Sequence, residues 1–174
     1  MHSSAMIRPQ APGDTAAIDA LHEEAFGPGR FARTAFRVRE AATRSPLIAL
    51  TTWIGEELVG AIQLSAVTIG GKRGAMLLGP LAIAPAFKNK GYGLGLMKAG
   101  LADAEALGFR LVVLVGDLPY YQRAGFRIIP PEQITLPGPV DPARFLAAEV
   151  TPRALLEFSG MVAADNAPPE VIAR

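Results

Sequence analysis

The chain of 174 residues contains no cysteine and only two histidines, His2 and His22. Without a thiol it forms no disulfide, no thiolate metal site and no cysteine nucleophile. Two histidines are too few for a histidine-rich metal centre, so we expect no bound metal. The lack of disulfides fits a reducing compartment, and the sequence therefore favours a cytoplasmic location.

The chain also lacks a charge excess, because 17 Lys and Arg balance 16 Asp and Glu to a net charge of +1. This balance argues against a protein that binds nucleic acid or a membrane surface. No apolar run approaches the roughly 18 residues that a spanning helix needs, and the first five residues are polar rather than a signal sequence. Half of the residues are hydrophobic, which is enough to build a sizeable core at this length.

The pattern of apolar residues and turns predicts one domain over residues 7–150. Residues 1–6 are expected to be a flexible start or the remnant of a tag, and residues 151–174 a C-terminal extension or tail. The predicted strands are 7–10, 47–54, 58–69, 75–83, 109–115, 126–129 and, as the last one, 145–150. The predicted helices are 14–26, 31–43, 91–107 and a short one at 120–124.

The most informative segment is an apolar strand that passes through Pro85 into a basic, glycine-spaced turn and then into a helix. Glycine lets the backbone approach an anion, and the amides and dipole at a helix start neutralise it. Alone, the segment fits equally well a tight turn with solvated lysines. It lacks the ending of a Walker loop, and the antiparallel strands before it do not suit a dinucleotide fold. Its residues are Lys88-Asn89-Lys90-Gly91-Tyr92-Gly93-Leu94.

A second cluster, Tyr120-Tyr121-Gln122-Arg123-Ala124-Gly125-Phe126, follows the next buried strand. Tyr121 lies in the neighbouring strand-to-helix turn, so it can face the same crevice as Gly91. A tyrosine has an ordinary pKa near 10 and can donate its proton to a departing thiolate at neutral pH. Either ring can instead pack beneath the following strand, which we expect for Tyr120.

Together these motifs resemble those of the GNAT superfamily of acyl-CoA N-acetyltransferases, in particular a bacterial subgroup. The family's cofactor motif, Arg/Gln-x-x-Gly-x-Gly/Ala, is matched by residues 88–93 apart from the lysine at its first position. Its later signature, Tyr-x-Lys/Arg-x-Gly-Phe, is matched by residues 121–126. The resemblance implies an α/β (α+β) fold whose mixed, mostly antiparallel sheet is flanked by helices and splayed between strands four and five.

The resemblance also implies the site. The main chain of Leu81, Ala82 and Ile83 would pair with the pantetheine arm of acetyl-CoA, and Tyr121 would protonate the thiolate of coenzyme A as it leaves. The acetyl group would pass directly to a primary amine, a small molecule ahead of a protein, without an acyl-enzyme. Seven consecutive amides would hold the pyrophosphate: those of Lys88, Asn89, Lys90, Gly91, Tyr92, Gly93 and Leu94.

The predicted fourth strand carries no glutamate, so the family's usual position for a general base is empty. Glu23, Glu24, Asp117 and a water chain are the alternatives. Because this glutamate is absent, the alternative hypothesis is a non-catalytic domain that binds or senses acyl-CoA.

The acceptor pocket is expected between the first two helices and the loops around Gly70 and Leu136. An exposed edge strand near Phe145 could support a homodimer. The candidate lining aromatics are Phe26, Phe31, Phe36 and Trp53.

Overall fold

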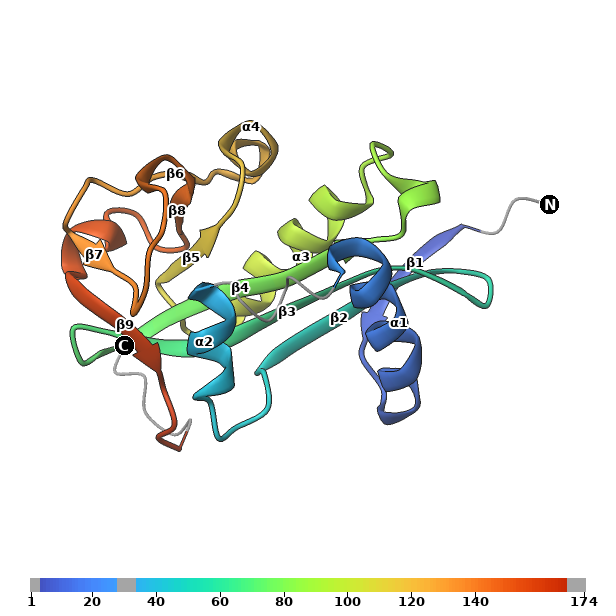
Figure 1. Ribbon diagram of the computed structural model, residues 1–174, viewed down its shortest axis with the longest axis horizontal. Coiled ribbons are helices and arrows are strands. Elements are labelled where there is room, and N and C mark those ends of the chain that lie inside the picture. Colours follow the sequence, from blue (N-terminus) through green and yellow to red (C-terminus); the bar gives the residue numbers. More distant parts are fainter. Residues whose placement is uncertain (1–3, 28–33, 169–174) are drawn as a thin grey trace.

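The computed structural model describes residues 4–27 and 34–168, and a mixed sheet forms the centre of this part of the chain (Figure 1). The strands are β1 (Ala5–Pro9), β2 (Ile48–Ile54), β3 (Glu57–Ile69), β4 (Lys72–Ile83), β5 (Leu111–Val115), β6 (Arg127–Ile128), β7 (Ile134–Thr135), β8 (Phe145–Glu149) and β9 (Gly160–Ala164). They lie in the order β1-β2-β3-β4-β5-β8-β6, with β9 paired to β3 and β7 to β9.

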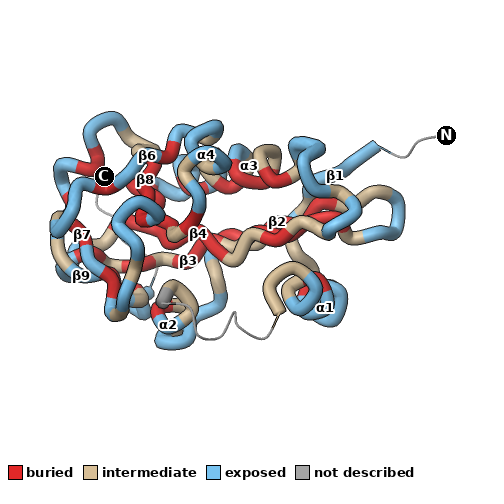
Figure 2. The backbone as a smooth tube through the Cα atoms, turned by 45° about the horizontal axis from the view of Figure 1, so that its top comes forward, coloured by how far each residue is buried: buried red, intermediate tan, exposed pale blue. Residues whose placement is uncertain are grey.

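Helices cover both faces of this sheet. Figure 2 shows α3 (Tyr92–Ala106) on one face, and α1 (Thr15–Phe26) and α2 (Thr34–Glu40) on the other. The short α4 (Leu118–Tyr121) follows β5. Leu96, Met97 and Ala104 are fully buried at helical spacing, and they pack α3 against the sheet. No helix in the described ranges is long and apolar enough to cross a membrane.

The predicted splay lies between β4 and β5. Strands β2, β3 and β4 form an antiparallel meander, whereas β4 and β5 are parallel because α3 carries the chain back across the sheet. The pairing of β4 with β5 ends at Leu77 and Val113, although β4 continues to Ile83. The last part of β4 is therefore open on its β5 side, and the predicted fold class is confirmed.

The prediction that the strand near Phe145 is an exposed edge and the last strand is wrong. Strand β8 lies between β5 and β6, and Phe145 is 4% exposed. Strand β9 comes later and pairs with β3, opposing Ala164 to Val67. The sequence of this strand, Gly-Met-Val-Ala-Ala, shows no clear alternation of apolar and polar residues, and only Val162 of the five is buried. Strand β8 is thus paired on both sides over residues 145–147, where the prediction had placed an exposed edge for a homodimer.

The start of α1 is fixed to β1 by an ion pair. The Asp14 carboxylate accepts from the Arg8 guanidinium at 2.8 and 3.0 Å and from the Ala11 amide at 2.7 Å. The bond from Arg8, followed by that from Ala11, lowers the pKa of Asp14 to about 2, so the carboxylate stays ionised at neutral pH. Asp14, the N-cap residue of α1, thus uses its side chain to hold this helix on the sheet, where it forms a wall of the cavity described next.

Candidate active site

The glycine-spaced turn presents main-chain amides that lack partners. The Lys88 amide, the first of the seven predicted donors, is already bonded to the Pro85 carbonyl at 3.4 Å. No amide from Asn89 to Leu94 donates to a carbonyl of another described residue, and the next to do so is Gly95, to Gly91 at 3.0 Å. Asn89 and Gly91 have φ angles of 62° and 89°, which turn successive amides toward one side. Residues 88–91 are exposed. The turn therefore offers a run of main-chain donors without partners at the start of α3, which is what an anion site requires.

Tyr120 borders this turn on one side. A Cβ atom at Gly93 would collide with the Tyr120 hydroxyl, so glycine is what allows the ring to lie there. Burial raises the pKa of Tyr120, and its ring meets that of Tyr121 edge to face at 5.0 Å. We expected Tyr120 to pack beneath the following strand, but it connects α4 to the first turn of α3. Sequence alone could not indicate this contact, because it depends on how the splayed strands place the two helices.

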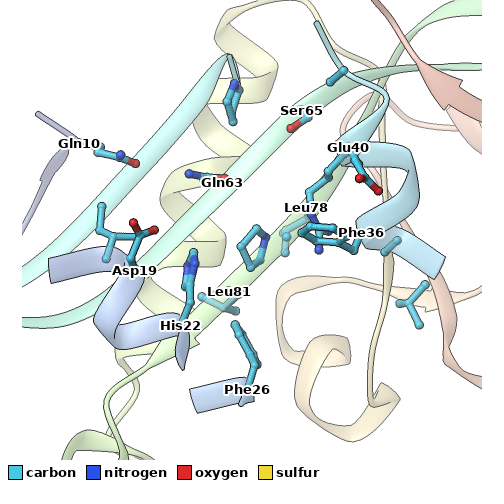
Figure 3. Close-up of a pocket in the computed structure, with 18 of the residues that line it drawn as sticks. Gln10, Asp19, His22, Phe26, Phe36, Glu40, Gln63, Ser65, Leu78 and Leu81 are labelled. Atoms are coloured by element: carbon cyan, nitrogen blue, oxygen red, sulfur yellow. The ribbon is translucent and has the colours of Figure 1, made fainter. Parts of the chain in front are cut away.

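A cavity of about 770 Å³ lies where the splayed end of β4 meets α1 and α2. Figure 3 shows its lining: Asp19, His22 and Phe26 come from α1, Phe36 and Glu40 from α2, and Gln63, Ser65, Leu78 and Leu81 from the sheet. The cavity is therefore built from segments far apart in the chain.

Tyr121 lines this cavity together with residues 78–81 of β4. Its ring lies on Gly116, where a Cβ atom would collide with it, and meets Phe126 edge to face at 5.9 Å. Packing on both sides thus holds the ring at the opening between β4 and β5. The structure brings Tyr121 and Leu81 to one cavity, while Ala82 and Ile83 continue β4 toward the turn that precedes α3.

The candidate bases are not all near this cavity. Glu23 lines it, whereas Glu24 does not. Asp117 is 75% exposed and forms an ion pair with Arg144 at 3.2 Å. His22, which sequence reasoning did not single out as a base, lies in the wall with its ring 5.8 Å from that of Phe26 (Figure 3). The signal available for His22 was its helical spacing from Ile18 and Phe26, which also fits ordinary packing.

This cavity is lined by the helices that were expected to form the acceptor pocket, but not by the expected loops. Phe26 and Phe36 line the cavity, but no residue of the loops around Gly70 and Leu136 does. Trp53 lies elsewhere, with its indole donating to the Thr51 hydroxyl at 2.9 Å. Phe31 lies outside the described residues. The segment after α2, with Arg44 and Pro46, takes the place of those loops.

The cavity lining carries both signs of charge. Three carboxylates, those of Asp19, Glu23 and Glu40, form no ion pair with any described residue. The guanidinium of Arg39 lies against Gly79 on the opposite side. Within residues 4–27 and 34–168 no group of three or more His, Asp or Glu side chains is placed to hold a metal ion. Arg44 adds a second guanidinium, so the cavity presents groups of both signs to whatever binds there.

Comparison with known proteins identifies relatives that share this architecture. The Brucella melitensis GNAT family acetyltransferase, solved in complex with acetyl-CoA, is 31% identical, and the match covers 94% of this chain and 97% of that one with a TM-score of 0.69. The Escherichia coli GNAT family N-acetyltransferase YhbS, solved in complex with CoA, has a TM-score of 0.82 at 24% identity, with 95% and 92% of the two chains covered.

A curated relative and a family model agree with these structures. The uncharacterized N-acetyltransferase YjhQ of Escherichia coli strain K12 is 28% identical over 116 residues, which are 65% of this chain and 64% of that relative. The match thus spans less than two thirds of the relative's length. The model of the acetyltransferase (GNAT) family matches residues 15–126, well over half of the chain, and includes both motifs. The chain therefore belongs to the acetyltransferase (GNAT) family.

Proposed function

We propose that the protein transfers the acetyl group of acetyl-CoA to a primary amine on a small molecule. One observation carries the proposal: the free amides at the start of α3 and the Tyr121 ring lie at the two ends of one open stretch of β4. A pyrophosphate on the amides would leave the pantetheine arm to run along residues 81–83. Its thioester would then reach the cavity beside Tyr121.

The residues of the chain have distinct tasks in this reaction. The stretch of β4 that has no β5 partner pairs with the pantetheine arm as with a further strand, and the free amides of the turn, together with Lys88 and Lys90, hold the phosphates. The amine nitrogen attacks the thioester carbonyl carbon, a C–N bond forms, and the C–S bond breaks. Tyr121 gives its proton to the sulfur, so the leaving group departs as a neutral thiol.

We assign His22 as the group that takes the proton from the amine. An amine is mostly protonated at neutral pH and must lose a proton before it can attack. A neutral imidazole in the cavity wall has one unprotonated ring nitrogen, which can accept the proton and pass it to solvent. Glu23 lines the same wall but stands on the exposed side of α1, which makes it the weaker candidate.

Replacing His22 with asparagine is expected to lower kcat/KM at neutral pH by roughly 10²-fold, the lower end of the range for a general base. The deficit should shrink as the pH rises, because the amine then loses its proton without help. The measurement is the rate of thiol release between neutral and alkaline pH. Glu24→Gln is the matched control, because Glu24 is on the same helix outside the cavity. If the loss of kcat/KM in His22→Asn were the same at every pH, His22 would not be the general base.

The proposed function is tested by binding and turnover together. Acetyl-CoA at about 100 times its dissociation constant should stabilise the fold by roughly 2.7 kcal/mol, seen as a raised Tm, whereas ATP and NAD should not. A panel of primary amines should then release free thiol from acetyl-CoA. Stabilisation by ATP without any response to acetyl-CoA would contradict the proposal.

A non-catalytic acyl-CoA sensor of the same fold is the second candidate. The observation that favours it is the absence of a glutamate from all of β4. A sensor would show the same rise in Tm with acetyl-CoA but no thiol release with any amine. The two assays therefore separate the candidates.

A further inference from the structure

A second cavity, of about 290 Å³, adjoins the candidate acceptor cavity. Ala42, Arg44 and Ser65 line both, so the two spaces meet at these residues. Most of the remaining lining is apolar, with Leu47, Ala66 and Phe109 among it. The two cavities thus adjoin, and the lining of the second is the more apolar.

The second cavity lies at a gap in the sheet. Strand β2 pairs with β3 only as far as Ile48 opposite Leu64, and β9 joins the same edge from Ala164 opposite Val67. Ser65 and Ala66 lie between the two partner strands. Neighbouring strand residues point to opposite faces, so the residues that line this cavity belong to both faces of the sheet edge.

The far wall of this gap is held in place by hydrogen bonds. The buried Asp165 carboxylate accepts from Arg73 at 2.7 Å, and the Asp165 amide donates to Ala66 at 3.0 Å. Asn166 binds the Thr43 amide at 2.8 Å through its side chain and accepts from Arg44 at 3.2 Å through its carbonyl. Hydrogen bonds therefore fix the segments that form this wall of the second cavity.

We propose that the acceptor amine carries an extended apolar tail and that this tail occupies the second cavity. The inference rests on the proposed function and names the class of its acceptor. The carboxylates of the first cavity suit the ammonium end of such a molecule, and the apolar lining of the second suits its tail. Because Ala42, Arg44 and Ser65 line both spaces, a molecule long enough to pass these residues would contact both.

The strand register sets the length of that molecule. Leu81 opposes Ile62, and Ser65 lies three residues farther along β3, which is about 10 Å at the rise of a strand. An extended chain advances roughly 1.2 Å per bond, so about eight bonds separate the reacting nitrogen from the junction. Only longer chains reach the second cavity.

The test compares butylamine, octylamine and dodecylamine as acceptors with saturating acetyl-CoA. In the wild-type protein kcat/KM should rise from butylamine to octylamine and again to dodecylamine, each time by at least roughly tenfold, since a fully buried methylene contributes up to about fourfold. Ala66→Leu fills part of the second cavity only. This variant should keep the first rise and lose most of the second.

Two further variants keep the test decisive. Ala167→Phe narrows the second cavity from an exposed segment, so it serves if the strand variant does not fold, and the same loss is expected. Ala163→Phe is the control, because this exposed alanine of β9 lines neither cavity. Equal gains from octylamine to dodecylamine in the wild type and both cavity variants would overturn the inference.

Calorimetric binding of dodecylamine to the protein saturated with CoA separates this failure from failure of the proposed function. Weaker binding in the cavity variants without turnover of any amine would support the tail site and contradict the enzyme. Turnover of short amines with no effect of chain length would support the enzyme and contradict the tail site.

Discussion

Replacing Tyr121 with phenylalanine is expected to lower kcat by about 10²- to 10⁴-fold, the range for loss of a general acid. The dissociation constant of acetyl-CoA should stay within roughly twofold, because binding is assigned to the main chain of β4 and the turn. The ring should keep its position, since its contacts with Gly116 and Phe126 do not use the hydroxyl. Single-turnover thiol release and calorimetric binding measure the two quantities.

The neighbouring tyrosine provides a matched comparison. The Tyr120 hydroxyl lies against Gly93 rather than in the cavity, so Tyr120→Phe should change kcat far less than the substitution at 121. A larger loss from Tyr120→Phe would mean that the other hydroxyl protonates the sulfur. Unchanged turnover in Tyr121→Phe would remove the assigned acid altogether.

Replacing Gly91 with alanine is expected to weaken acetyl-CoA binding by at least roughly tenfold. No atom lies within 4 Å of the place where the new methyl group would stand, so it would project into the space assigned to the pyrophosphate. A hydrogen bond to a charged group contributes about 1.5–3 kcal/mol, so the loss of even one gives this effect. The φ of 89° adds a stability cost of roughly 1–2 kcal/mol, which a Tm measurement reports separately.

Gly95, one turn farther along α3, is the control. A methyl group there would meet Ile7 at 3.8 Å, an ordinary contact. Gly95→Ala should therefore raise stability by up to about 1 kcal/mol, as expected for alanine in a helix, and leave acetyl-CoA affinity unchanged. If Gly91→Ala lowered Tm but bound acetyl-CoA normally, the turn would not be the phosphate site.

Several elements follow from local patterns, and the structure agrees with the prediction of each. The meander of β2, β3 and β4 has clear turns at Gly55 and Gly70, and α3 has helical spacing of its buried residues. The splay follows from the family resemblance carried by two contiguous motifs. Strand β9 was missed because it depends on pairing with a distant strand rather than on its own pattern.

The acceptor cavity was predicted only in part, for a similar reason. Phe26 and Phe36 were expected to line it, and they do, but the roles of Ser65 and Arg44 in joining two cavities had no sequence signal. Single polar residues in a strand or loop look like ordinary surface positions. Whether such a residue lines a cavity depends on whether a partner strand lies beside it, and this is set by the tertiary structure.

The sequence by itself determined the family and the residues expected to hold the acyl donor. Those residues are contiguous, and the physics of a glycine-spaced helix start is local, so a short motif specifies it. Only the tertiary structure decided the shape of the candidate acceptor cavity and the presence of a second cavity beside it. These features arise where α1, α2, β3 and the segment after β9 meet, and long-range packing and strand register place such segments, not the sequence of any one of them.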